Sequence, residues 1–325
     1  MSRFPRQWLA EAQQRLAPHI RQTPLEYDSK HNIYIKWENV QRTGSFKIRG
    51  ALNKILSLDD WELEKGVVAA SAGNHGQGVA LAARMRKVKA IIVASNHAVP
   101  SKLDAMRQLG AEIHLVDGGY ELAEAEGIQL AEQTGAVWVS PYNDSLVIAG
   151  QGTIGLEIAD QLGTTRLADI RVIVMPIGGG GLAAGMGAAF EGLSGSIQLI
   201  GAQPEASPFF HAILTNGSQE GVVETESLAD GLSGAVQEGA ITIPLVKSYL
   251  TGITLVSEAE IEQAIAYAWY AHGQTIEGSA AAALAALLSG KVAHRPAVVV
   301  LTGGNIQSDT HTEICQRWTK RSSQW

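Results

Sequence analysis

The chain has 325 residues, of which 46% are hydrophobic and 18% are charged, with a formal net charge of −7. This length and balance indicate a globular protein with room for two lobes and a buried core, and they argue against a disordered chain. The negative charge, with no long basic run to offset it, argues against nucleic acid or an anionic membrane as a main partner.

Nothing in the chain predicts secretion or a membrane span. The first 20 residues mix charged and apolar residues at helical spacing and lack the apolar core of a signal peptide. The longest run of alanine and leucine, residues 280–288, is far shorter than the roughly 20 residues that cross a bilayer, so we expect a buried helix there. The only cysteine, Cys315, cannot form an internal disulfide. A reducing compartment, the cytoplasm, is therefore expected.

The first segment that carries chemistry is residues 44–50, Gly-Ser-Phe-Lys-Ile-Arg-Gly. Lys47 stands at its centre beside the aromatic Phe46, and the glycine at either end allows a tight backbone. An isolated lysine of this kind is most often a surface residue at the start of a helix. If it lies instead in an apolar pocket, desolvation lowers its pKa and frees the amine as a nucleophile. The motifs that follow favour the second interpretation.

A series of short apolar runs alternates with helical stretches between residues 66 and 139. Continuous apolar runs are typical of strands buried on both faces, and the intervening helices are long enough for right-handed crossovers between parallel strands. The series therefore predicts an open, doubly wound sheet. The predicted strands are residues 67–70, 90–93, 112–116 and 136–139, and helices are expected over 101–109 and 120–133.

A polar loop follows the first of these strands directly. It contains Ser71, Ala72, Gly73, Asn74 and His75, and a helix is expected to begin there. At the carboxyl edge of an open parallel sheet, free amides and hydroxyls collect, and ligands commonly bind. The loop is therefore a candidate binding site.

A second series of strands is predicted over residues 170–175, 199–202 and 297–301. Thr302 follows the last of them directly and precedes two glycines, so its hydroxyl would stand at the carboxyl end of a central strand. The alternative for Thr302 is a residue that only caps the following turn.

A run of glycines, Gly178 to Gly181, follows the first strand of this second series and opens a helix of small residues. Its amides can close around a phosphate dianion at the positive end of the helix dipole. The rival interpretation is a dinucleotide fingerprint. Gln203, with Glu205 two positions further, stands where that fingerprint requires a ribose-binding acid at the end of the next strand, which favours the phosphate cradle.

Together the four motifs supply what pyridoxal phosphate needs: an amine for its aldehyde, a polar loop, a phosphate cradle and a hydroxyl for the ring nitrogen. In this order they resemble the threonine/serine dehydratase (threonine ammonia-lyase) branch of the fold type II pyridoxal phosphate enzymes, which is related to serine racemase. The resemblance runs from about Thr23 to Asn305. Ile48 supports this branch, because the cysteine synthase and threonine synthase branches usually have aspartate after the lysine.

The resemblance implies pyridoxal 5′-phosphate as the cofactor and Lys47 as the catalytic residue, which bonds the cofactor and removes the substrate α-proton. Asn74 would bind the phenolic oxygen, and Thr302, a neutral hydroxyl, would face the ring nitrogen and leave the ring a weaker electron sink. For His75, a packed residue that orients the loop is favoured over a proton-transfer group. The implied cofactor-binding residues are Phe46, Lys47, Asn74, Gly178, Gly179, Gly180, Gly181, Leu182 and Thr302, and the implied substrate-binding residues are Ser71, Ala72, Gly73, Asn74 and His75.

The expected fold is α/β, with two open, mostly parallel, doubly wound sheets and helices on both faces. The resemblance implies that residues 1–54 fold with the second series. A large cofactor-binding lobe of residues 1–54 and 145–325 would then contain a small lobe, residues 55–144, as an insertion. Because the chain stops soon after the last strand, we expect no C-terminal regulatory domain.

Two positions separate the dehydratases from serine racemase. The racemase carries a serine as its second acid/base where this chain has Ala72, which cannot titrate. The divalent cation site of the racemase uses carboxylates where this chain has Gln203 and Phe209, and only Glu205 could replace part of it. We therefore expect no racemisation and no required metal.

The expected activity is dehydration and deamination of L-threonine, and of L-serine, to 2-oxobutyrate or pyruvate and ammonia. Alternatives are a dehydratase for another β-hydroxy amino acid, such as hydroxyaspartate or phenylserine, or serine racemase. A non-catalytic cofactor-binding regulatory protein is the alternative from another class, but neither the lysine nor the ring-binding loop is lost. The resemblance further implies a homodimer and a role in amino-acid metabolism such as isoleucine biosynthesis.

Overall fold

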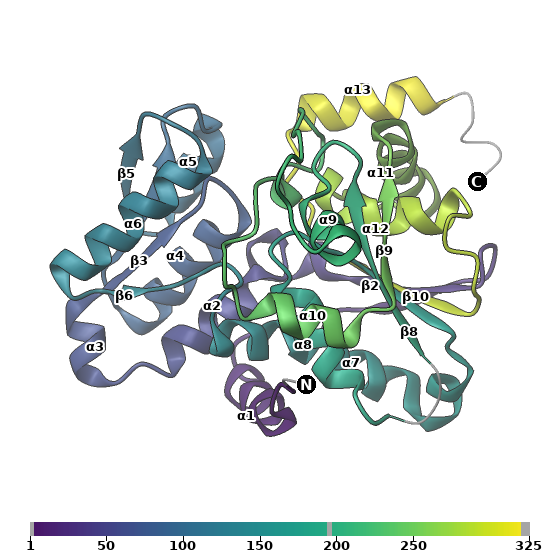
Figure 1. Cartoon of the computed structure of the whole chain (residues 1–325), viewed down its shortest axis with the longest axis horizontal. Coiled ribbons are helices and arrows are strands. Elements are labelled where there is room, and N and C mark those ends of the chain that lie inside the picture. The colour runs from purple at the N-terminus through teal and green to yellow at the C-terminus, as the bar shows by residue number, and fades with distance from the viewer. Residues whose placement is uncertain (1–2, 194–196, 320–325) are drawn as a thin grey trace.

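The computed structural model describes residues 3–193 and 197–319, which form two α/β parts that lie side by side (Figure 1). One part is built on a four-stranded sheet and the other on a six-stranded sheet. Among the described helices, none combines the length and the apolar character that a membrane span requires.

The smaller sheet is entirely parallel, with the strand order β5-β4-β3-β6. Alternate residues of β3 face opposite hydrophobic clusters: Val67 and Ala69 pack toward α4 and α5, and Val68 and Ala70 pack toward α6. Both faces are therefore buried, which explains the continuous apolar runs in the sequence. The elements are β3 (Val67–Ala70), β4 (Ala90–Ser95), β5 (Glu112–Val116), β6 (Val137–Trp138), α3 (Asp60–Lys65), α4 (Asn74–Arg86), α5 (Pro100–Gln108) and α6 (Tyr120–Thr134).

The larger sheet has the order β1-β2-β10-β7-β8-β9 and is parallel except for the β1/β2 hairpin at its edge. Its strands are β1 (Leu25–Asp28), β2 (Ile33–Trp37), β7 (Val172–Pro176), β8 (Gln198–Pro204), β9 (Gly252–Val256) and β10 (Ala297–Leu301). Its helices are α1 (Arg6–Leu16), α2 (Lys47–Leu56), α7 (Ser145–Asp169), α8 (Gly181–Phe190), α9 (Phe209–Asn216), α10 (Thr242–Tyr249), α11 (Glu258–His272), α12 (Gly278–Leu288) and α13 (Ser308–Trp318), with short 3-10 turns η1 (Glu38–Val40), η2 (Arg42–Gly44) and η3 (Asp230–Leu232).

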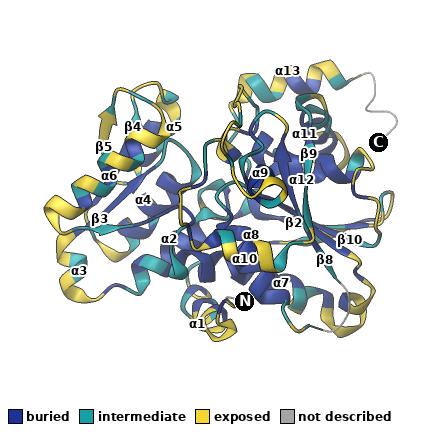
Figure 2. Ribbon diagram, viewed as in Figure 1, coloured by how far each residue is buried: buried dark blue, intermediate teal, exposed yellow. Residues whose placement is uncertain are grey.

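Helices also cover both faces of the larger sheet. Ile173 and Met175 of β7 pack into the cluster that contains α7 and α8, whereas Val172 and Val174 pack into the cluster that contains α11 and α12. Helix α12 is buried along nearly its whole length (Figure 2), as expected of the alanine-rich run. The predicted fold class, two mostly parallel doubly wound sheets with helices on both faces, is confirmed.

The predicted strands are mostly in place, with three differences. The strand expected over 136–139 is reduced to Val137–Trp138, because β6 is an edge strand that pairs with β3 at only two positions. The β1/β2 hairpin and β9 were not predicted from the sequence. The lobe boundaries at residues 54 and 145 stay a prediction.

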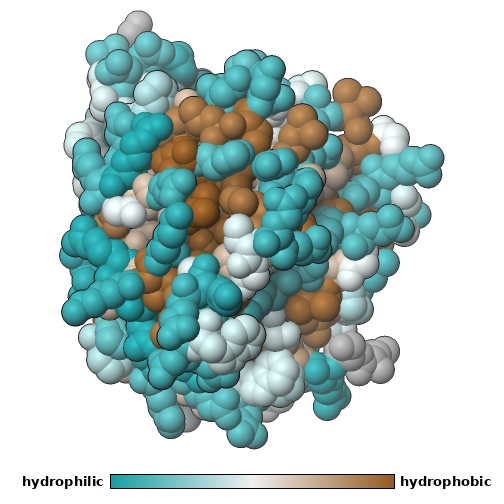
Figure 3. Space-filling model, turned by 90° about the vertical axis from the view of Figure 1, so that its left-hand side faces the viewer, coloured by the Kyte–Doolittle hydropathy of each residue, from teal (hydrophilic) through white to brown (hydrophobic). Residues whose placement is uncertain are grey.

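The outer face of the smaller-sheet part is turned to the viewer in Figure 3, where apolar side chains lie among polar ones. Exposed large apolar residues in this part include Leu115 of β5 and Leu122 of α6.

A buried ion cluster fixes α2 to the larger sheet. Arg49 is fully buried and donates to Glu38 of η1 and to Glu157 of α7, with distances of 2.7–2.9 Å. Lys36 of β2 donates to Glu157 at 2.8 Å. The four formal charges cancel, and every charged group has a close partner, as buried ions require. The cluster thus holds the helix whose first residue is Lys47.

Candidate active site

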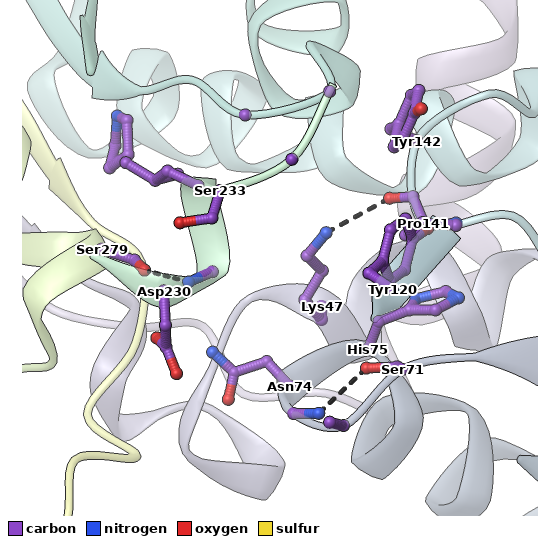
Figure 4. A pocket seen from close by; sticks show the side chains of 18 of the residues that line it. Lys47, Ser71, Asn74, His75, Tyr120, Pro141, Tyr142, Asp230, Ser233 and Ser279 are labelled. Atoms are coloured by element: carbon purple, nitrogen blue, oxygen red, sulfur yellow. Dashed lines mark hydrogen bonds between the residues drawn. The ribbon is translucent and has the colours of Figure 1, made fainter. Parts of the chain in front are cut away.

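A cavity of about 510 Å³ lies between the two parts, at the carboxyl ends of β3, β7 and β10 (Figure 4). It is lined by every residue predicted from the sequence to bind the cofactor or the substrate. Segments that are far apart in the sequence therefore come together at one place, which is where open parallel sheets bind ligands.

Lys47 enters the cavity from the start of α2. Its Nζ donates to the carbonyl of Pro141 at 3.3 Å and lies 5.3 Å from the centre of the Phe46 ring (Figure 4). Burial lowers the pKa of the Lys47 amine to about 8, against the opposing effect of the Glu277 carboxyl. A lysine with this pKa has a substantial neutral, nucleophilic fraction near neutral pH.

The loop of residues 71–75 joins β3 to α4. The Ser71 hydroxyl accepts a hydrogen bond from the Gly73 amide at 3.0 Å, and α4 begins at Asn74. The first turn of a helix has amides without intrahelical partners, so this end of α4 can bind an anionic group such as a carboxylate. Ala72 lines the cavity and offers no titratable group.

His75 is buried beside this loop, and its Nε2 lies 2.8 Å from the carbonyl of Val139. Because a carbonyl only accepts, Nε2 carries the proton and Nδ1 is a lone-pair acceptor, which is buried and has no hydrogen-bond partner among the described residues. Burial and the Lys47 charge lower the pKa of His75 to about 3. His75 therefore stays neutral near neutral pH, in agreement with a packed residue that orients the loop.

The glycine run lies at the start of α8. Gly180 has a φ of +88°, a left-handed conformation that favours glycine. A Cβ on Gly179 would overlap the ring of Tyr142, and one on Gly180 would lie 2.7 Å from the ring of Phe210. Glycine is therefore required at both positions, and because the run lines the cavity at a helix N-terminus, it can cradle a phosphate; Leu182 follows in the first turn of α8.

Thr302 follows β10 and is buried at the cavity wall. Its carbonyl accepts from the amide of Phe46 at 2.9 Å, which ties the end of β10 to the segment that carries Lys47. The Thr302 hydroxyl, by contrast, makes no hydrogen bond to any residue that the structure describes. It is available to a heteroatom of a bound ring.

Several lining residues had no assigned role in the sequence analysis. Lys102 of α5 and Asp230 of η3 form an ion pair of 2.7 Å that joins the two parts of the molecule. Glu277, buried before α12, accepts a hydrogen bond from Asn74 at 2.6 Å. An acidic residue ahead of an apolar helix looks like an ordinary helix start in the sequence, so only the tertiary contacts single out Glu277.

The segment with Gln203 and Glu205, which stands where the racemase has its cation site, contacts protein groups. The Gln203 side chain accepts from the amide of His211 at 2.8 Å. The Lys291 amine lies 3.4 Å from Glu205 and 2.8 Å from Glu260. Within residues 3–193 and 197–319, no group of three or more histidine, cysteine, aspartate or glutamate side chains is arranged to hold a metal ion.

These residues fit pyridoxal phosphate. A desolvated amine, a run of glycines whose side-chain substitutes would collide with Tyr142 and Phe210, and a hydroxyl without a hydrogen bond among the described residues line a single cavity. Lys47 can bond the aldehyde, Gly178 to Gly181 can hold the phosphate, and Asn74 and Thr302 can contact the ring.

Comparison with known proteins places the chain in a family. Residues 16–303 match the family described as pyridoxal-phosphate dependent enzyme. The chain belongs to this family, and pyridoxal phosphate is its cofactor.

Three known proteins are similar to the chain over most of its length. The chain is 40% identical over 321 residues to an L-threonine ammonia-lyase of Thermotoga maritima, covering 97% of this chain and 79% of that protein. It is 39% identical over 316 residues to the catabolic L-threonine dehydratase of Escherichia coli strain K12, covering 94% of both. The crystal structure of serine racemase from Dictyostelium discoideum superposes with a TM-score of 0.84 at 35% identity, covering 93% of this chain and 98% of that one.

Proposed function

We propose that the protein is an ammonia-lyase that converts L-threonine, and L-serine, to the 2-oxoacid and ammonia by removal of the α-proton and loss of the β-hydroxyl. The observation that carries the proposal is Lys47, an amine with a pKa near 8 in the cavity that the glycine run and the polar loop also line. The names of the relatives, L-threonine ammonia-lyase and L-threonine dehydratase, support the choice of substrate.

When bound, pyridoxal phosphate supplies a conjugated electron sink for the substrate α-carbon. The Lys47 amine would act as the base at the substrate α-carbon, because its lowered pKa leaves more of the amine neutral near neutral pH. The amides at the start of α4, with Ser71, hold the substrate carboxylate. Ala72 offers no acid or base, so a proton that leaves the α-carbon has no second group to return it.

The ion pair between Lys102 and Asp230 has a part in this proposal. It connects α5 to η3, and both residues line the cavity. A pair at the cavity wall that joins the two parts helps to hold α5 and η3 together beside the substrate site. We also propose the lobe division at residues 54 and 145, a homodimer, and a cytoplasmic location.

The test is to incubate the purified holoenzyme with L-threonine and to measure 2-oxobutyrate and ammonia in equal amounts. L-serine, hydroxyaspartate and phenylserine are assayed beside it. Turnover of L-threonine with the highest kcat/KM is expected. A clear preference for hydroxyaspartate or phenylserine would overturn the substrate assignment, and no release of ammonia from any of the four would overturn the lyase assignment.

A further inference from the structure

Glu277 is a second titratable group in the cavity, apart from Lys47. Its carboxyl is buried and accepts from the Asn74 side chain at 2.6 Å, and the backbone of Asn305 acts on its pKa. A Cβ on Gly303 would overlap the Glu277 carboxyl, so the carboxyl lies against the chain that follows Thr302. Glu277 is thus placed at the ring side of the site by close contacts, although the reaction proposed above does not use it.

The neighbouring amides fix how Asn74 faces Glu277. Asn305 Nδ2 donates to the backbone carbonyl of Thr43 at 2.8 Å and to Asn74 Oδ1 at 2.7 Å. The Thr43 carbonyl can only accept, so the group of Asn305 that faces it must be the amide nitrogen. Asn74 must then present its oxygen to Asn305 and its nitrogen to Glu277. The backbone carbonyl of Thr43 therefore determines, through Asn305, which way the Asn74 amide faces.

This arrangement leaves one N–H of Asn74 for a ligand. Nδ2 carries two hydrogens, and the Glu277 carboxyl takes one of them. The other is available at the cavity wall, where Asn74 is proposed to hold the phenolic oxygen of the cofactor. When the ionised Glu277 carboxylate accepts from one N–H of Asn74, it polarises the amide and changes how strongly the other N–H donates to the phenolic oxygen.

We propose that Glu277 is a positioning residue that sets the charge at the phenolic side of the cofactor, acting through Asn74 and without contact to the substrate. The inference rests on the proposed function, because it assigns Asn74 to the phenolic oxygen. Ionised Glu277 accepts a hydrogen bond from the Asn74 amide, which Asn305 already orients, and places a negative charge two hydrogen bonds away from the chromophore. Protonated Glu277 removes that charge.

The charged surroundings of Glu277 put this change near neutral pH. Burial, and after it the charge of Asp230 of η3, raise the pKa of Glu277 to about 7, against the lowering effects of the Asn74 hydrogen bond, Lys102 of α5 and the Asn305 backbone. Lys47 of α2 also faces the carboxyl. From α4, Asn74 is uncharged and His75 stays neutral, so Asp230, Lys102 and Lys47 are the charges that act on Glu277.

The experiment is a pH titration of the visible absorption of the holoenzyme, together with the Kd of pyridoxal phosphate. In the wild type, we expect a spectral transition with a midpoint near 7. Glu277→Gln keeps an oxygen for Asn74 but cannot ionise, so it should retain the cofactor with less than about a tenfold change in Kd and lose the transition. Glu277→Asp should restore a transition. A merely structural role would change the Kd and leave the titration in place.

Two further variants test the sign of the effect. Asp230→Asn removes a repelling charge and should lower the midpoint by about half a pH unit, whereas Lys102→Met removes an attracting charge and should raise it by a similar amount. Glu224→Gln is the matched control, because Glu224 lines the same cavity but accepts from Ser207 and Gly234. Its midpoint should equal that of the wild type.

A transition that persists unchanged in Glu277→Gln overturns the inference. If this variant does not fold, midpoints of Asp230→Asn and Lys102→Met that do not move in opposite directions overturn it instead. A wild type that deaminates L-threonine without any spectral transition leaves the proposed function standing and removes the inference alone. A wild type that binds pyridoxal phosphate and titrates, but releases no ammonia, removes the proposed reaction alone.

Discussion

Lys47 and Arg49 lie two residues apart on α2, and they meet opposite electrostatic surroundings. Arg49 points into the core, where burial acts to lower its pKa, but Glu38 and Glu157 more than offset this effect and the pKa is raised. Lys47 points into the cavity, where it has the Pro141 carbonyl as its hydrogen-bond partner, and its pKa falls to about 8. Burial therefore opposes the charge at both positions, but two carboxylates compensate it at Arg49, whereas at Lys47 it produces a reactive amine.

The largest effect is expected from removing the uncompensated cation. Lys47→Ala should abolish the visible band of the bound cofactor and lower 2-oxobutyrate formation by about 10³-fold or more, because Lys102, the other lysine among the described residues that line the cavity, is paired with Asp230 and cannot replace it. Absorption spectra and the ammonia assay measure both. Lys54→Ala is the control, since Lys54 lies on the same helix and pairs with Asp144. Turnover retained in a folded Lys47→Ala variant would show that the comparison assigns the wrong residue.

Removing the compensated cation should cost stability instead. Arg49→Met leaves the buried Glu38 with the Thr23 hydroxyl and the buried Glu157 with Lys36, and should lower the free energy of unfolding by about 3–5 kcal/mol. Urea denaturation followed by circular dichroism gives this value. Arg317→Met, which breaks an exposed pair with Glu262, should change it by less than about 1 kcal/mol. Equal losses from the two variants would contradict the structural role of the cluster.

The proposed phosphate site requires glycine, just as the buried ion cluster requires paired charges. Gly179→Ala places a methyl group against the Tyr142 ring and should weaken pyridoxal phosphate binding by roughly 10- to 100-fold, the range that overpacking costs. Equilibrium titration with pyridoxal phosphate measures the loss. Gly119→Ala is the control, because a Cβ there meets nothing within 4 Å and its φ is −79°. An unchanged affinity in Gly179→Ala would remove this run from the phosphate site.

A smaller effect concerns the second face of the substrate. Because Ala72 cannot titrate, the wild type should eliminate from L-serine without accumulating D-serine. Ala72→Ser should give slow but measurable D-serine, since a hydroxyl without a tuned pKa is a poor acid. Chiral chromatography of L-serine reactions separates the two products. D-serine formed by the wild type as fast as pyruvate would mean that another group serves this face.

The smallest effect is expected from removing divalent cations. Glu205, which could form part of a cation site, already lies near the exposed Lys291. The Lys291 amine lies near Glu205 and Glu260, and the Gln203 side chain accepts from a backbone amide, so these groups already have partners other than a metal ion. Chelation with EDTA should therefore leave kcat and KM within about twofold of their untreated values. The assay is repeated after dialysis against EDTA and after addition of Mg²⁺. A large loss that Mg²⁺ reverses would reveal oxygen ligands at this place.

Much of the site was readable from the sequence because its parts are local. Each motif directly follows a predicted strand and so lies at the carboxyl edge of a sheet, where ligands bind. The motifs are Ser71 to His75, the glycine run and Thr302. The β1/β2 hairpin, β9 and the short β6 were missed or misjudged. β1, β6 and β9 are edge strands that are only partly buried, so their hydrophobic pattern is weak, whereas β2 is a buried strand whose parallel partner β10 is distant in the sequence.

By itself, the sequence determined the fold class, the cofactor and the residues at the ends of the central strands, because hydrophobic periodicity and glycine placement act within a few residues. Tertiary structure alone decided which charged groups meet. Glu277 reaches Asn74 across 203 positions of sequence, and Arg49 reaches Glu157 across 108. Burial and Coulomb interactions depend on distances in space, so the pKa values that separate a reactive lysine from a structural arginine arise only when the chain is folded.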